Sequence, residues 1–174
     1  MKASVFVGIS LDGFIARPGG ELDFLPAGGG EPHGYDEFIA SIDALVIGRN
    51  TYETVLAFEQ WPYGSKPVFA LSTHALPPAP ASAVVKSLSG EPADIVRQLE
   101  ARGFRHIYVD GGMTIQRFLR AGMIQRIVIT RVPVLIGAGI PLFGTLQHDI
   151  ALRHLATRSY ASGLVSSEYE VVGG

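Results

Sequence analysis

The sequence contains no cysteine, which excludes disulfide bonds and metal sites built on thiolate ligands. It also lacks an apolar run of membrane-spanning length, and its first residues lead into a strand-like pattern without the hydrophobic core of a signal peptide. An excess of one charge is missing too: 14 basic residues nearly balance 16 acidic ones, which disfavours nucleic-acid binding. We therefore expect a cytoplasmic protein with neither nucleic-acid nor membrane partners.

The histidines are too scattered to indicate a metal site. None of them forms a pair with the spacing that metal ligands usually have, so surface or packed imidazoles are the expected roles. The five are His33, His74, His106, His148 and His154. We therefore predict that the protein binds no metal ion.

Length and hydrophobic content indicate one globular domain. The 174 residues suffice to bury a core, and 47% of them are hydrophobic. No repeat, charge block or long linker divides the chain, and the proline-rich segment 76–82 is short enough to be a surface loop. The glycine-rich segment 26–35 is either a mobile lid or a plain connection. We expect a single domain over residues 1–174.

Short apolar runs alternate with helical patterns along the chain. Runs typical of strands buried on both faces span residues 3–10, 43–48, 67–72, 105–110 and 125–135. Apolar residues at helical spacing occupy residues 35–42, 50–57, 91–103 and 114–122. Weak alternation on either side of Ser162 and Gly163 is typical of a final antiparallel hairpin. This order predicts an α/β fold with a mixed, mostly parallel sheet and helices on both of its faces.

The junctions between strands and helices are the places to search for a site, because ligands of such sheets bind outside the carboxyl ends of the strands. Asp110, Gly111 and Gly112 separate an apolar run from a helical pattern. Bare backbone N–H groups at a helix start can approach a phosphate closely. A tight turn that needs a positive φ is the alternative explanation of the glycine pair.

Two further junctions carry polar residues. Gly48 ends one apolar run, and Arg49 and Thr51 open the next helical pattern, where they suit either a phosphate or a helix cap with a surface arginine. Ser72 and Thr73 follow another run, where they could cap a turn or hold a phosphate. Because adjacent parallel strands bring their carboxyl ends to one edge of the sheet, the three junctions together favour a shared anion site.

The segments GISLDGFIA, IGRNTYE, LST and VDGGMTIQRFL occur in the order and approximate spacing of the dihydrofolate-reductase-like family. Within that family, the chain most resembles stand-alone relatives of the riboflavin-biosynthesis reductase domain, which is the C-terminal domain of a bifunctional deaminase-reductase. The resemblance spans almost the whole chain. It implies a three-layer α/β/α sandwich, NADPH as the cofactor, a homodimer, and hydride transfer to a heterocycle.

The resemblance implies cofactor contacts residue by residue. The matching positions form a segment at the adenosine phosphates, one at the ribose 2′-phosphate, a turn under the pyrophosphate and a loop beside the nicotinamide. In that order they are Gly48, Arg49 and Thr51; Ser72 and Thr73; Gly111, Gly112, Met113, Thr114 and Ile115; and Gly8 with Ile15. An arginine with two hydroxyl residues favours NADPH over NADH, because a 2′-phosphate needs a cation and donors, whereas a 2′-hydroxyl usually meets a carboxylate.

Asp12 and Asp110 are the carboxylates that we expect nearest the reacting centre. The riboflavin-pathway relatives carry an acid at the position that matches Asp110, next to the substrate. Asp12 belongs to an Asp-Gly pair, which equally indicates a turn. Either carboxyl group would need a raised pKa to act as an acid near neutral pH.

The substrate side departs from the two best-known members of the family. Asp36 or Glu37 could replace the helix carboxylate that pairs with the pterin in folate reductases. No basic residue from Tyr52 to Ser65 matches the arginine that holds the glutamate tail. Riboflavin-pathway reductases hold a ribose phosphate with basic residues, whereas the charged residues of segment 34–48 are all acidic and would repel a phosphate. We therefore expect a smaller or uncharged heterocycle of pteridine or pyrimidine type.

Two functions stay open. The first is an NADPH-dependent reductase of such a heterocycle. The second is a non-catalytic dinucleotide-binding module, a regulator or partner-binding dimer that has the cofactor edge without a substrate. Asp12 and Asp110 favour the enzyme, but a fold with a cofactor site does not by itself establish a reaction.

Overall fold

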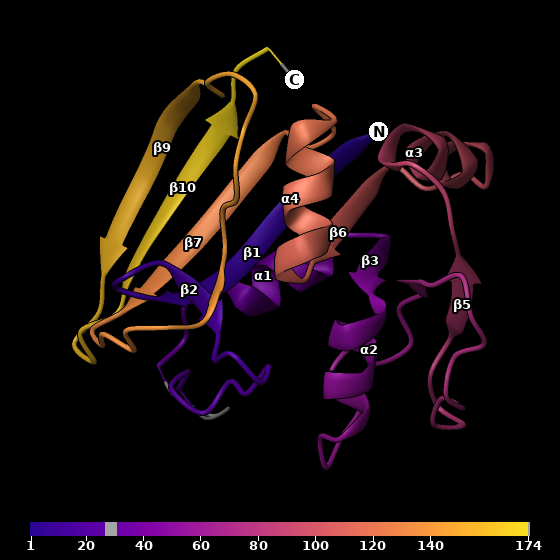
Figure 1. The fold of residues 1–174 in the computed structure, drawn as a ribbon, viewed down its shortest axis with the longest axis horizontal. Coiled ribbons are helices and arrows are strands. Elements are labelled where there is room, and N and C mark those ends of the chain that lie inside the picture. The colour runs from indigo at the N-terminus through magenta and orange to yellow at the C-terminus, as the bar shows by residue number, and fades with distance from the viewer. Residues whose placement is uncertain (27–30, 174) are drawn as a thin grey trace.

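The computed structural model describes residues 1–26 and 31–173, and one large sheet forms its centre (Figure 1). Within this described part, the eight strands of the sheet lie in the order β5-β4-β3-β6-β1-β7-β10-β9. Neighbours from β5 to β7 are parallel, and β10 is antiparallel to both β7 and β9. The strands are β1 (Lys2–Ser10), β3 (Ala44–Gly48), β4 (Val68–Leu71), β5 (Val85–Leu88), β6 (His106–Asp110), β7 (Arg126–Val132), β9 (Leu152–Ser159) and β10 (Val165–Val171).

Helices cover both faces of this sheet, with α4 in front of it and α1 behind it in Figure 1. The helices are α1 (Tyr35–Ser41), α2 (Arg49–Leu56), α3 (Pro92–Ala101) and α4 (Gly112–Arg120). Phe38 of α1 belongs to one core, and Phe118 of α4 belongs to the other. Because successive side chains of a strand point to opposite faces, β1 serves both cores: Phe6 joins the α1 core and Val7 joins the α4 core.

A small second sheet lies beside the carboxyl end of β1. In it β2 (Phe14–Ala16) pairs antiparallel with β8 (Ile140–Pro141). Further backbone bonds join the same two segments, because Leu11 N–H donates to the Val134 carbonyl at 2.8 Å and Leu142 N–H donates to the Gly13 carbonyl at 3.1 Å. The residues after β1 and the residues after β7 therefore lie side by side next to the ends of the central strands.

The predicted fold class is confirmed. The sheet is mixed and mostly parallel, helices lie on both faces, and β9 and β10 form the predicted hairpin. The strand predicted over 125–135 is shorter than expected: β7 ends at Val132, because Pro133 has no N–H group for a sheet ladder. The strands of the small sheet are three and two residues long, which is too short for a periodic pattern in the sequence.

Within residues 1–26 and 31–173, no helix is long and apolar enough to cross a membrane. In the same part of the chain, no group of three or more histidine, aspartate or glutamate side chains is placed to hold a metal ion. The glycine-rich segment 26–35 is interpreted as either a mobile lid or a plain connection. Its residues 27–30 lie outside the described residues.

Candidate active site

A cavity of about 560 Å³ lies at the carboxyl ends of the central strands, the edge where the sequence predicts a site. Two groups among the lining residues differ in chemical character. The donor end consists of Gly48, Arg49, Thr51, Gly111, Gly112, Met113 and Thr114. The aromatic end consists of Phe6, Tyr35, Tyr63, Tyr108 and Asp110. The two ends meet where Asp110 is followed by Gly111.

The donor end is formed where the β3–α2 and β6–α4 junctions touch each other. A methyl group on Gly48 would lie 2.7 Å from Thr114 Oγ1, and one on Gly111 would overlap the hydroxyl oxygen of Thr51. Gly111 also has a φ of 97°, in the left-handed region that favours glycine. The glycine pair therefore serves the turn, and at Gly111 it also allows the close contact between the two junctions.

The start of α4 presents backbone donors to the cavity. Gly111 is its N-cap and supplies no side-chain cap, so the first-turn N–H groups of Gly112, Met113 and Thr114 have no partner inside the helix. The positive end of the helix dipole lies at the same place. Ile115 differs from these residues, because its side chain is fully buried in the core and its N–H already donates to the Gly111 carbonyl at 2.8 Å.

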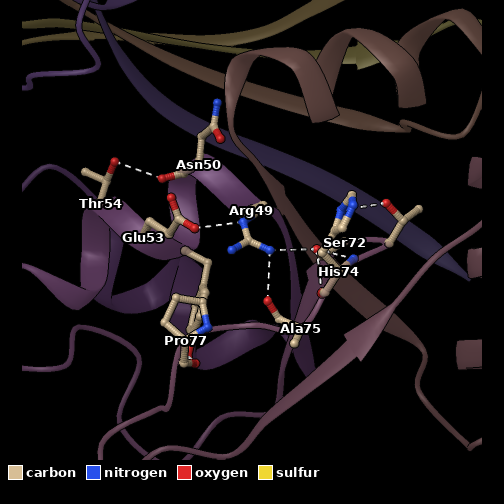
Figure 2. A network of polar contacts seen from close by, with 10 residues as sticks. Arg49, Asn50, Glu53, Thr54, Ser72, His74, Ala75 and Pro77 are labelled. Atoms are coloured by element: carbon tan, nitrogen blue, oxygen red, sulfur yellow. Dashed lines mark hydrogen bonds and ion pairs between the residues drawn. The ribbon is translucent and has the colours of Figure 1, made fainter.

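Arg49 opens α2, and three contacts hold its guanidinium (Figure 2). Nε donates to Glu53 Oε1 at 2.7 Å. Nη1 donates to the Ala75 carbonyl oxygen at 2.9 Å and to Ser72 Oγ at 3.3 Å. Because Ser72 and Ala75 follow β4, these bonds tie the first turn of α2 to the next strand end and fix the guanidinium at the cavity wall.

The other positions predicted for the cofactor separate into two groups. Gly8 and Ile15 line the cavity. Ser72 and Thr73 are not among the described residues that line it. Ser72 is linked to the cavity through its bond to Arg49, whereas the exposed Thr73 bonds only to its neighbour's ring among the described side chains.

Asp110 ends β6 and lines the cavity between its two ends. The Gly111 N–H donates to its Oδ1 at 2.7 Å. Burial raises the pKa of Asp110 to about 6, although the Gly111 N–H and the Tyr108 hydroxyl favour the charged form. The carboxyl group therefore changes its protonation near neutral pH, as a catalytic acid must.

Asp12 lies in a different environment, exposed in the turn after β1. Its carboxylate accepts the N–H of Gly137 at 2.7 Å and that of Ile136 at 3.2 Å, so it ties this turn to the segment before β8. The Ser10 hydroxyl and then these N–H groups lower the pKa of Asp12, which leaves it ionised at neutral pH. Asp36 is exposed in the first turn of α1. Neither aspartate lines the cavity in the described part of the chain, and their site roles stay predictions.

The aromatic end contains two tyrosines that the sequence analysis does not single out. Tyr35 rests against Phe6 with ring centroids 5.5 Å apart, and Tyr63 packs edge-on against Trp61 with ring centroids 5.3 Å apart. Tyr35 comes from the start of α1 and Tyr63 from the loop after α2, so only the folded chain brings them to one cavity. A tyrosine among apolar residues gives no local signal of a ligand role.

Several proteins of known structure or sequence are similar to this chain. A putative riboflavin biosynthesis protein from Shewanella sp. PV-4 is 39% identical, and its crystal structure matches with a TM-score of 0.90 over 98% of this chain and 99% of its own. The uncharacterized protein YwjB of Bacillus subtilis is 28% identical over 166 residues, or 94% of each chain. Dihydrofolate reductase from Enterococcus faecalis, solved with NADP(H) and RAB-propyl, has the same fold at 15% identity, with a TM-score of 0.61 over 98% of this chain and 94% of its own.

The fold, with a cavity at its strand ends, is of the dihydrofolate-reductase-like class. The family model of the RibD C-terminal domain matches residues 2–166, and the chain belongs to that family. The resemblance seen in the sequence is thereby confirmed, both for the fold class and for the relation to the riboflavin-biosynthesis reductase domain.

Proposed function

We propose that the protein is an NADPH-dependent reductase that transfers hydride to a small, uncharged heterocycle of pteridine or pyrimidine type. The observation that carries this proposal is the position of Asp110. This residue has a raised pKa and lies where the donor end of the cavity meets the aromatic end. Membership of the RibD C-terminal domain family supports a reductase.

The donor end suits the phosphates of a dinucleotide. The first-turn N–H groups of α4, with no Cβ at Gly111 and Gly112, would let a pyrophosphate approach the backbone. Arg49, fixed beside the Ser72 hydroxyl, would bind the 2′-phosphate that distinguishes NADPH from NADH. When bound, the reduced nicotinamide supplies the hydride.

Asp110 supplies the proton in this proposal. Reduction of a C=N bond adds hydride to the carbon and a proton to the nitrogen, and the protonated carboxyl group of Asp110 donates that proton. The Gly111 N–H, 2.7 Å from Oδ1, stabilises the carboxylate that remains. The carboxylate then regains a proton from water for the next turnover.

The aromatic end supports an uncharged substrate. Among the described residues that line the cavity, the cations are Arg49 at the start of α2 and Arg117 of α4, and neither belongs to the aromatic end. Arg117 donates to the Gly90 carbonyl at 3.1 Å, before α3. A phosphate at the aromatic end would meet the carboxyl group of Asp110 without a neighbouring cation to offset the repulsion.

Turnover separates this enzyme from the alternative of a non-catalytic binding module. We expect NADPH absorbance to fall when members of a panel of small pteridines and pyrimidines are added to the protein. NADPH binding without turnover of any compound in the panel would favour the module. Failure to bind either NADPH or NADH would contradict both functions.

We also propose a homodimer that forms through β9. This strand lies at the edge of the sheet and is mostly exposed, and an edge strand offers unpaired backbone groups to a second chain. Leu152 and Leu155 on it are 42% and 47% exposed. Light scattering at micromolar protein should give twice the chain mass of 18.6 kDa, and Leu155→Glu should lower it. A monomer mass for the unaltered protein would contradict this assembly.

A further inference from the structure

In the part of the chain that the structure describes, two phenol hydroxyls at the aromatic end have no protein partner, unlike those of the buried Tyr52 and Tyr108. The Tyr52 hydroxyl donates to the Pro77 carbonyl at 2.8 Å, and the Tyr108 hydroxyl donates to the Phe6 carbonyl at 2.6 Å. Among the described residues, the hydroxyls of Tyr35 and Tyr63 make no hydrogen bond to any other protein group, although both side chains line the cavity. A hydroxyl group that lines a cavity and has no protein partner can donate its hydrogen bond to a molecule bound in that cavity.

These two hydroxyls open to the cavity and are not sealed in the core. The side chain of Tyr63 is only 6% exposed, but its hydroxyl oxygen keeps some contact with solvent. The same holds for the half-buried Tyr35. Both residues line the cavity. A ligand in the cavity could therefore accept a hydrogen bond from each.

The orientation of both rings is already fixed. Tyr35 meets Phe6 with an angle of 65° between the ring planes, and Tyr63 meets Trp61 at 90°. Edge-to-face packing of this kind restricts the rotation of each ring, so less rotamer freedom is lost when a ligand binds. Packing alone would need only phenylalanine at these positions, and the hydroxyl groups therefore have no packing role.

The electrostatic surroundings keep both phenols as neutral donors. Burial raises the pKa of Tyr35 to about 12, and the negative charges of Asp110 and Asp36 add to the effect. The pKa of Tyr63 is raised well above its ordinary value, by burial first and then by Asp110. Tyr35, Tyr63 and Asp110 all line the same cavity, so a ligand bound there can contact the three side chains together.

We propose that Tyr35 and Tyr63 are specificity-determining residues, which donate hydrogen bonds to two acceptor atoms of an uncharged planar heterocycle bound beside Asp110. Carbonyl oxygens and unprotonated ring nitrogens are suitable acceptors, as in dioxopyrimidines and oxopteridines without a phosphate. A heterocycle that lacks these acceptors leaves buried donors unpaired and is rejected. This inference rests on the proposed function and names the substrate class of the same cavity.

Single-atom deletions test the inference. Tyr35→Phe and Tyr63→Phe remove one hydroxyl each, and Tyr52→Phe is the matched control, because its hydroxyl bonds to Pro77 outside the cavity lining. Calorimetric titration of each variant with lumazine and with 5,6-diaminouracil, in the presence of NADP⁺, measures the affinity. We expect each of the two cavity variants to bind the better probe about 3- to 10-fold more weakly, and the control to bind it as the unaltered protein does.

The outcomes separate this inference from the function on which it rests. Failure of the unaltered protein to bind NADPH would remove the proposed function. If NADPH binds, the inference alone is overturned by unchanged affinity in both cavity variants, by the absence of binding of either probe, or by an equal loss in Tyr52→Phe. Tighter binding of uridine 5′-monophosphate than of both probes would also overturn it, because it would mean a phosphate site at the aromatic end.

Discussion

The donor end and the aromatic end of the cavity differ in how the chain builds them. The donor end comes from two short junctions, and it presents backbone N–H groups and a guanidinium. The aromatic end comes from β1, α1, the loop after α2 and β6, and it presents side chains around one acid. The difference teaches that one cavity combines backbone donors and a cation at one end with aromatic side chains at the other, with Asp110 between them.

The contrast also appears in the two carboxyl groups that the sequence selects. Asp12 is exposed and accepts backbone N–H groups, and its pKa is lowered. Asp110 is half-buried in the cavity lining, and desolvation raises its pKa to about 6. Because a catalytic acid must hold a proton near neutral pH, the physical chemistry favours Asp110 for that role and a structural role for Asp12.

The largest expected effect comes from removing the acid. Asp110→Asn keeps an oxygen that can accept the Gly111 N–H but cannot donate a carboxyl proton, so kcat should fall about 100- to 1000-fold. The rate of the unaltered enzyme should fall as pH rises above about 6, because the protonated form is then lost. Steady-state rates across pH, with NADPH affinity as the control, check both statements. Asp12→Asn reducing kcat as strongly would refute the distinction between the two carboxyl groups.

Filling the donor end should remove cofactor binding. Gly111→Ala adds a methyl group that overlaps the Thr51 hydroxyl oxygen at a φ of 97°, so we expect NADPH binding to be lost and the thermal midpoint to drop. Gly122→Ala is the matched control, because Gly122 has a φ of 66° but nothing within 4 Å of an added Cβ. The control should destabilise the protein through backbone strain and leave NADPH binding intact. Equal loss of binding in both variants would mean that general destabilisation, and not the donor end, is responsible.

The raised pKa of Asp110 should also affect the stability of the protein, without any substrate. Asp110 binds its proton more tightly in the folded chain than at its ordinary pKa of 3.8, so its contribution to stability is largest at low pH and is lost as pH rises through about 6. The loss is on the order of 3 kcal/mol at neutral pH. Urea unfolding at about pH 4 and about pH 7.5 should therefore show Asp110→Asn gaining stability relative to the unaltered protein at the higher pH. A difference between the two proteins that does not change with pH would contradict the raised pKa.

The smallest effect concerns the support of Arg49. Glu53→Ala removes the acceptor of Arg49 Nε, so NADPH should bind about 2- to 3-fold more weakly while NADH binding stays unchanged. Glu53→Gln keeps an oxygen acceptor and should restore the affinity. Titration calorimetry with both nucleotides measures this difference. Tighter NADPH binding in Glu53→Ala would mean that Glu53 acts by repelling the phosphate instead.

Much of the fold could be predicted because its signals are local. The buried parallel strands are continuous apolar runs, and the helices between them carry apolar residues at helical spacing. Ends of elements were less predictable: β7 stops at Val132, three residues before its apolar run ends. The pairing of β2 with β8 depends on contacts between residues 14–16 and 140–141, which no short window of sequence contains.

The residues of the candidate site also differ in whether local sequence signals could predict them. Gly48, Arg49 and Gly111 could be found because the donor end is built from strand-to-helix junctions, where residue type alone indicates a turn or an anion site. Tyr35 and Tyr63 could not, because they are 28 positions apart and reach the cavity only through tertiary packing. For Ile115 the motif predicts a cofactor contact, but helical periodicity turns its side chain into the core.

A parallel titration with NADPH and NADH tests the central claim most directly. The account predicts that NADPH binds more tightly than NADH, and that Arg49→Ala weakens NADPH binding about 10-fold or more while leaving NADH binding unchanged. Arg97→Ala is the matched control, because Arg97 is an exposed α3 residue paired with Asp94 outside the cavity lining, and it should change neither affinity. Equal affinity for the two nucleotides, or binding of neither, would contradict the account.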